Sequence, residues 1–146
     1  MRRANFLLLG ITAFVCSVSQ LSAVTIYGAA YLQGGPATLY TIDPNTGVAT
    51  PIGLTGFDRV SAIDFNPLTG ILYGAGVLTG DMTGAVQLFT INTTTGAGTT
   101  VGATGIMGAF GTTSAFTDMS FHSDGTLFGI ISNQVYTINI TTGLAT

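Results

Sequence analysis

The sequence predicts an all-β protein built from repeated units of four short antiparallel strands. Three observations support this prediction. The phrase LYTIDPNTG at residues 39–47 returns in altered form at 88–96 and at 135–143. Between these copies, short runs alternate apolar and polar residues, which is typical of strands with one buried face. After residue 23, no stretch shows the 3.6-residue periodicity of an amphipathic helix.

The first 23 residues differ from the rest of the chain. Arg2 and Arg3 precede an apolar run at 6–18 that is too short to span a bilayer comfortably, and QLSA at 20–23 offers a cleavage site, with Leu21 where a smaller residue is favoured. This pattern is typical of a secretory signal peptide. We therefore expect residues 1–23 to be cleaved off after Ala23 and the remaining protein to be secreted. An uncleaved N-terminal anchor is the alternative.

The composition of residues 24–146 excludes several classes of function. This segment has one base, Arg59, against six aspartates, and it contains no Lys, Glu or Cys and a single His. A nucleic-acid-binding surface needs Lys and Arg to replace the counterions of the phosphates, so we expect no nucleic-acid partner. We also predict no disulfide, no cofactor, no metal site and no catalytic residues, because few side chains could carry that chemistry.

Taken in order, one unit of the sequence shows all four strands. They are expected at 60–65, 70–76, 86–92 and 98–104. Tight turns join the first strand to the second and the third to the fourth, as in NPLTG at 66–70 and NTTTG at 92–96. In such turns Asn or Asp bonds the backbone two residues on, and Gly accepts a positive φ at the exit. Asp43 and Asn92 occupy the same place in two copies, which predicts an Asx-type turn.

The spacing of the copies predicts the architecture. They begin at residues 39, 88 and 135, and a period of roughly 40–50 residues is typical of β-propeller blades. The chain then holds about two and a half blades of four antiparallel strands. Their approximate ranges are 24–56, 57–105 and 116–146.

The repeated segments also resemble a known group of proteins. LYTIDPNTG and AIDFNPLTGILYG, residues 62–74, resemble the repeat of exported bacterial β-propeller proteins of unknown function. They are more loosely similar to YVTN-type and quinoprotein amine dehydrogenase β-chain-like propellers. The resemblance covers nearly all of 24–146 and implies the propeller fold, but it implies no particular activity. Met119 and His122 depart from the pattern, since the earlier copy has Ile63 and Asn66 there.

The number of blades raises a further question. Propellers typically close with about 4 to 8 blades, and two and a half blades would leave apolar sheet faces exposed. We expect the chain to be a fragment of a larger propeller. Two alternatives stay open: several copies that close a ring by self-association, and a small sandwich fold.

Loop spacing indicates where a binding site would lie. The connections from the second to the third strand, and from one blade to the next, vary in length and emerge at one rim, whereas the other turns hardly vary. Function often resides in loops on a rigid scaffold, although neutral loop drift would give the same pattern. The candidate face comprises 29–37, 56–60, 77–85 and 105–116. Its candidate binding residues are Tyr31, Gln33, Asp58, Arg59, Asp81 and Phe110.

These observations predict a secreted, non-catalytic β-propeller repeat protein. It would have a binding, display or extracellular structural role through its loop face, with an extracellular protein or glycan as partner. The alternative is a fragment of a propeller enzyme, quinoprotein-like or glycan-acting, whose catalytic residues lie outside this chain.

Overall fold

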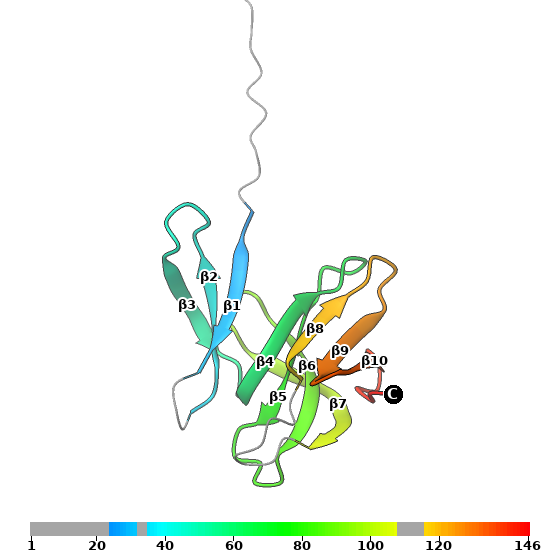
Figure 1. Cartoon of the computed structure of the whole chain (residues 1–146). Coiled ribbons are helices and arrows are strands. Elements are labelled where there is room, and N and C mark those ends of the chain that lie inside the picture. The colour runs from blue at the N-terminus through cyan, green and yellow to red at the C-terminus, as the bar shows by residue number, and fades with distance from the viewer. Residues whose placement is uncertain (1–23, 32–34, 108–115) are drawn as a thin grey trace, which may run out of the picture.

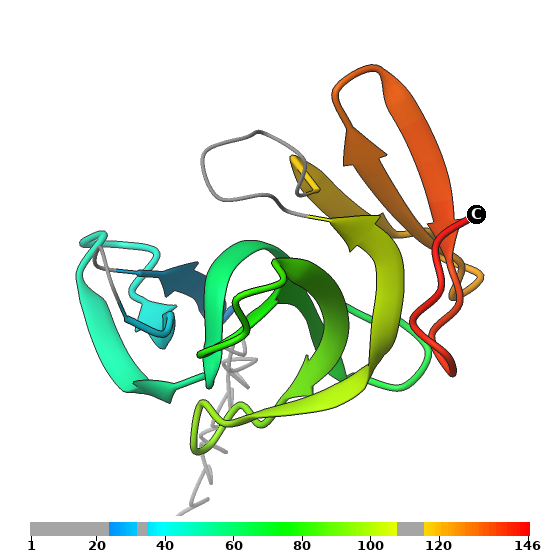
Figure 2. The same ribbon diagram turned by 90° about the horizontal axis from the view of Figure 1, so that it is seen from below.

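The computed structural model describes residues 24–31, 35–107 and 116–146. Over these residues, ten strands form three antiparallel sheets, and no helix is present (Figure 1). The all-β prediction is therefore confirmed. Figure 2 shows the sheets side by side in chain order, as an open arc.

Each sheet consists of strands that are consecutive in the chain. The first sheet contains β1 (Ile26–Ala30), β2 (Thr38–Ile42) and β3 (Ala49–Leu54). The second contains β4 (Phe57–Phe65), β5 (Leu72–Leu78), β6 (Ala85–Ile91) and β7 (Gly98–Met107). The third contains β8 (Asp118–Phe121), β9 (Leu127–Ile131) and β10 (Gln134–Ile138).

The second sheet is the predicted four-stranded unit. The first sheet corresponds to the second, third and fourth strands of that unit, and the third sheet to the first three. An isolated antiparallel bridge between Ile138 and Ala145 adds the beginning of a fourth strand to the third sheet. The described residues thus follow the predicted strand order, with different strand limits in the second sheet.

Several of those limits were predicted wrongly. β5 was expected at 70–76 but spans Leu72–Leu78, so Val77 and Leu78 belong to this strand and not to the predicted 77–85 loop. Residues 56–60 were expected to form a loop, but β4 already begins at Phe57, which pairs with Leu78. Only Thr55 and Gly56 separate β3 from β4. Gly56 has a φ of 78°, which lets the chain reverse within two residues. In the same way, β7 continues to Met107 rather than ending at residue 104.

The predicted Asx-type turn is present in all three copies of the repeated phrase. The side-chain oxygens of Asp43, Asn92 and Asn139 each accept a bond from the backbone N–H two residues later, at 2.7, 2.8 and 2.9 Å. The glycines that end these turns have φ values of 71°, 80° and 83°. The repeated phrase is therefore a strand followed by the same tight turn.

The sheets pack through two apolar clusters, one between each pair of neighbours. Both junctions contain the same aromatic contact. The ring of Tyr27 meets Phe65 edge to face at 5.5 Å, and Tyr73 meets Phe121 in the same way at 5.3 Å. A tyrosine of one sheet therefore meets a phenylalanine of the next in both cases.

A pair of glycines repeats in the same manner. Gly53 in β3 lies against the backbone carbonyl of Thr95, and Gly102 in β7 lies against that of Thr142. Because a Cβ at either glycine would overlap the carbonyl oxygen, only glycine permits this close approach. Each of these contacts joins the last strand of one sheet to an Asx-type turn of the next.

Two buried threonines tie the sheets together at equivalent places. The hydroxyl of Thr55 donates to Ala37 O, and that of Thr104 donates to Val86 O, both at 2.9 Å. Their own carbonyls accept bonds from the following sheet, Thr55 O from Gly98 N at 2.9 Å and Thr104 O from Ala145 N at 3.0 Å. At each junction, the hydroxyl of one threonine therefore holds the end of its own sheet, and the carbonyl of the same threonine bonds the next sheet.

Candidate functional site

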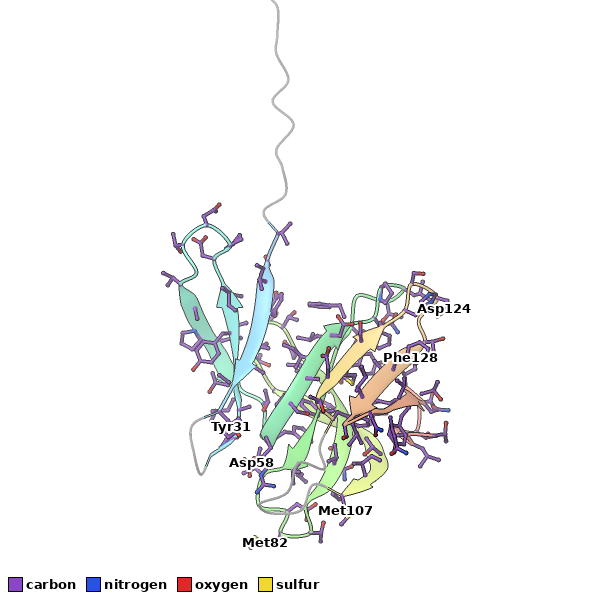
Figure 3. The ribbon with its side chains drawn as sticks, in the orientation of Figure 1. Tyr31, Asp58, Met82, Met107, Asp124 and Phe128 are labelled. Atoms are coloured by element: carbon purple, nitrogen blue, oxygen red, sulfur yellow. The ribbon has the colours of Figure 1, made fainter. Side chains whose placement is uncertain are left out.

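The variable connections gather at one end of the sheets, as predicted from the alternation of strand direction. We call this the loop end and define it by Tyr31, 55–59, 79–84 and Met107. Figure 3 shows Tyr31, Asp58, Met82 and Met107 toward this end and Asp124 at the opposite one. The opposite end, called the turn end, carries the Asx-type turns and the β4–β5 and β8–β9 turns.

Asp58 joins two of the connections at the loop end. The hydroxyl of Thr79 donates to Asp58 Oδ1 at 2.9 Å, and the Thr79 N–H donates to Gly56 O at 3.1 Å. These bonds hold the β3–β4 turn against the β5–β6 loop. Asp58 therefore positions the loops.

Arg59 occupies a strained position in β4. Its φ of 50° lies in the left-handed region, which is uncommon for a residue other than glycine. The register of β4 against β5 shifts between Asp58 and Ala62, so Arg59 lies within a β-bulge. Bulges of this kind redirect side chains at the rims of sheets.

Asp81 shapes the β5–β6 loop. Its Oδ1 accepts bonds from the hydroxyl and from the backbone N–H of Thr83, each at 2.7 Å. These two bonds, the hydroxyl first, lower the pKa of Asp81 below its ordinary value. The carboxylate thus stays charged at the loop end while it holds a local turn.

Tyr31 follows β1 with 52% of its surface exposed. The two other predicted site residues, Gln33 and Phe110, lie outside the described residues. The structure thus places Tyr31, Asp58, Arg59 and Asp81 at the predicted end and joins Asp58 to the loop that contains Asp81.

The prediction missed the apolar side chains of the loop end. Met82 is 80% exposed, and Leu54, Leu78 and Met107 are 60%, 46% and 53% exposed. The predicted residues were four polar or charged ones and the aromatic residues Tyr31 and Phe110. Met82 within VLTGDMTGA and Met107 within GIMGAF were the available signals, since each is a long apolar side chain in a predicted loop.

The turn end also exposes apolar side chains, but each sits in a separate tight turn. Val48 and Leu68 are 60% and 67% exposed. Exposure alone therefore does not distinguish the two ends. The distinction is that the turn end repeats one Asx-type turn in all three units, whereas the loop-end connections differ from unit to unit.

His122 lies at the turn end, in the β8–β9 turn that its alignment with Asn66 predicts. Its Nδ1 lies 3.1 Å from Asp124 Oδ1, with both side chains more than half exposed. The pKa of Asp124 is lowered to about 2, mainly by the backbone N–H of Thr126 and then by the Thr126 side chain and by His122. These contacts stay within one turn.

Across residues 24–31, 35–107 and 116–146, no three His, Cys, Asp or Glu side chains come close enough together to hold a metal ion. The described part of the chain contains no helix of the length and apolarity needed to cross a membrane.

No protein-family model matches this chain, and no curated protein or solved structure matches it either.

Proposed function

We propose that the three sheets are successive blades of a β-propeller, and that the chain is a secreted, non-catalytic module that binds an extracellular protein through its loop end. The repeated sheet junctions support the propeller. The same aromatic pair, glycine contact and threonine bond occur where the first sheet meets the second and where the second meets the third. A junction that repeats in this way is expected when like blades stack around an axis.

The observation that carries the binding function is the division between the two ends. At the turn end, three copies of one Asx-type turn have nearly the same hydrogen bonds. At the loop end, the connection between β9 and β10 is only Ser132 and Asn133, whereas 31–37 and 79–84 are longer. Loops that vary on a constant scaffold are where binding surfaces are usually found.

The chemistry of the loop end favours a protein partner. Tyr31, Met82 and Met107 expose flexible or aromatic apolar surface, and Asp58 and Asp81 place carboxylates beside it. Aromatic residues and Met are enriched in the centre of protein interfaces, with polar groups around them.

A capture experiment with two matched double variants tests this function. The immobilised protein is exposed to the extracellular fraction of its source cells and, separately, to a glycan array. Met82→Asp with Met107→Asp alters the loop end, and Val48→Asp with Leu68→Asp alters the turn end to the same extent. We expect the loop-end variant to lose a protein that the unaltered chain and the turn-end variant both retain.

Three results would contradict the proposal. Equal retention by the loop-end variant would move the site elsewhere. Loss in both double variants would indicate non-specific adhesion. Loop-end-dependent retention of a glycan with no protein captured would replace the protein partner with a carbohydrate.

A further inference from the structure

Residues of the three sheets can be matched one to one, because the second and third strands of the repeated unit pair in the same register in each sheet. These strands are β1 and β2, β5 and β6, and β9 and β10. The cross-strand pairs are Gly28 with Tyr40, Gly74 with Phe89, and Gly129 with Tyr136. Each glycine also lies close to the isoleucine two residues after its partner: Ile42, Ile91 and Ile138. Matched residues of the three sheets should therefore be buried to the same extent wherever a neighbouring sheet covers them.

Each sheet has two different faces. In the second sheet, Leu72, Phe89 and Ile91 face the first sheet. Tyr73, Ala75 and Leu88 belong to the cluster shared with the third sheet. We call the face toward the preceding sheet the leading face and the other the trailing face. Both junctions join a trailing face to the leading face of the next sheet.

The leading face of the first sheet is uncovered among the described residues. Ile26 is 41% exposed, whereas its equivalents Leu72 and Leu127 are 2% and 1% exposed. Beside it, a hollow of 230 Å³ is lined by small and apolar residues. They are Gly28, Ala29, Ala30, Tyr40, Ile42 and Ala49.

The trailing face of the third sheet is uncovered as well. Val135 is 66% exposed, whereas its equivalents Leu39 and Leu88 are both 0% exposed. Ile130, on the neighbouring strand, is 39% exposed where Ala75 is 0% exposed. Phe128, labelled in Figure 3, holds the place of Tyr27 and Tyr73, the tyrosines that meet the next sheet.

We infer that a second copy of this chain covers these faces, with the leading face of its first sheet against the trailing face of the third. The surfaces of β1 with β2 and of β9 with β10 are the kinds that already meet twice within the chain, so the contact continues an existing interface. Among the described residues, the first sheet has no counterpart of β4 and β8, the strands that supply Phe65 and Phe121 at the two junctions. The contact joins β9 and β10 to β1 and β2, and the carboxylate of Asp118, the cross-strand partner of Ile130, lies at its β8 edge.

The contact is head to tail, so each copy keeps one free face of each kind. Such an interface is heterologous and either closes a ring or extends into a filament. The inference depends on the sheet faces and is independent of the loop end. The two proposals can therefore fail separately.

Sedimentation and light scattering of the purified secreted protein test the inference. The unaltered chain should assemble in a concentration-dependent way. Val135→Asp and Ile26→Asp should each shift it to a monomer with an unchanged far-UV circular dichroism spectrum, and Met82→Asp should assemble like the unaltered chain. Val135→Thr keeps the branched shape and should weaken assembly less than Val135→Asp, which separates a surface effect from misfolding.

Val135→Asp and Ile26→Asp are the two face variants, and mixing them tests whether the contact between copies is head to tail. An equimolar mixture of Val135→Asp and Ile26→Asp retains one intact leading face and one intact trailing face, so it should form a complex of two chains. Assembly that survives either single variant, or a mixture that stays monomeric, would overturn the head-to-tail contact. A monomeric unaltered chain at every concentration would exclude the second copy and leave further blades as the occupant.

Discussion

At the scale of single residues, Thr104 shows how one side chain supports the fold. It is completely buried, donates its hydroxyl hydrogen to Val86 O and accepts a bond from Ile106 N at 3.2 Å. Thr55 makes the corresponding bonds to Ala37 and Phe57. Both threonines lie in a TG pair that repeats in the sequence, yet neither was predicted to be buried, because a threonine near a turn usually faces solvent.

We expect Thr104→Val to destabilise the protein. Valine has the same shape as threonine but no hydroxyl, so Val86 O and Ile106 N each lose a hydrogen-bond partner. Leaving such buried groups without a partner lowers the free energy of unfolding by about 1–3 kcal/mol. Urea unfolding followed by circular dichroism measures this change. Thr104→Ser keeps the hydroxyl and should lose less stability; equal losses in the two variants would mean that the methyl group, and not the hydrogen bonds, is responsible.

The turn carboxylates should make stability depend on pH at the acid end. The pKa of Asp124 is about 2 in the folded protein against 3.8 ordinarily, and the pKa values of Asp43 and Asp81 are also lowered. A depressed pKa contributes stability that is present above the ordinary pKa and is lost as the pH falls through the folded value. The unfolding temperature should therefore fall between about pH 4 and pH 2.

Replacing Asp124 by Asn removes one of these groups and should flatten part of that fall in unfolding temperature. Thermal unfolding across the acid range compares the two proteins. Asp43→Asn should keep its turn, because Asn92 and Asn139 already form the same turn in the other copies. Curves that stay parallel for Asp124→Asn and the unaltered chain would contradict the assignment of the pH effect to this carboxylate.

At the scale of strands and turns, the local pattern was highly predictive. The runs around Ile63, Tyr73 and Phe89 alternate as strands should, and the structure places them in β4, β5 and β6. The start of β4 was not predictable from neighbouring residues. Phe57 joins the strand because its ring stacks on Phe89 at 3.8 Å, a contact between residues far apart in the sequence.

We expect Gly102→Ala to weaken the junction between the second and third sheets. Its Cβ would overlap the carbonyl of Thr142, so the turn that ends at Gly143 must move. Overpacking of this kind typically costs about 1–3 kcal/mol. Urea unfolding provides the measurement, and Gly35→Ala is the control, because a Cβ at Gly35 meets nothing within 4 Å. Similar effects of the two variants would disprove the close approach.

At the scale of the whole molecule, the second sheet is covered on both faces and its two neighbours on one face each. Ala75, Leu88 and Phe89 are all 0% exposed, whereas Ile26 and Val135 on the outer faces are 41% and 66% exposed. The free energy of local opening should therefore be highest in the second sheet, where the most apolar surface must be uncovered.

Hydrogen exchange followed by mass spectrometry tests this order. The amides of Leu72–Leu78 and Ala85–Ile91 should exchange most slowly, and those of β1 and β10 should exchange sooner. If β1 or β10 of the unaltered chain were protected as well as β5, while Ile26→Asp and Val135→Asp removed that protection, the head-to-tail contact would be the cause. The same protection in both face variants would contradict a graded stability within the chain.

The sequence by itself determined the strands, their order and the Asx-type turns, because these depend on residues close together in the chain. Asp43 and Asn92 bond N–H groups two residues away, and such bonds form whatever surrounds them. Only the tertiary structure decided that Gly53 meets the next turn, that Thr55 is buried, and that Ile26 and Val135 stay exposed. Those outcomes depend on which sheet face lies against which, and that is set by stacking between residues distant in the sequence.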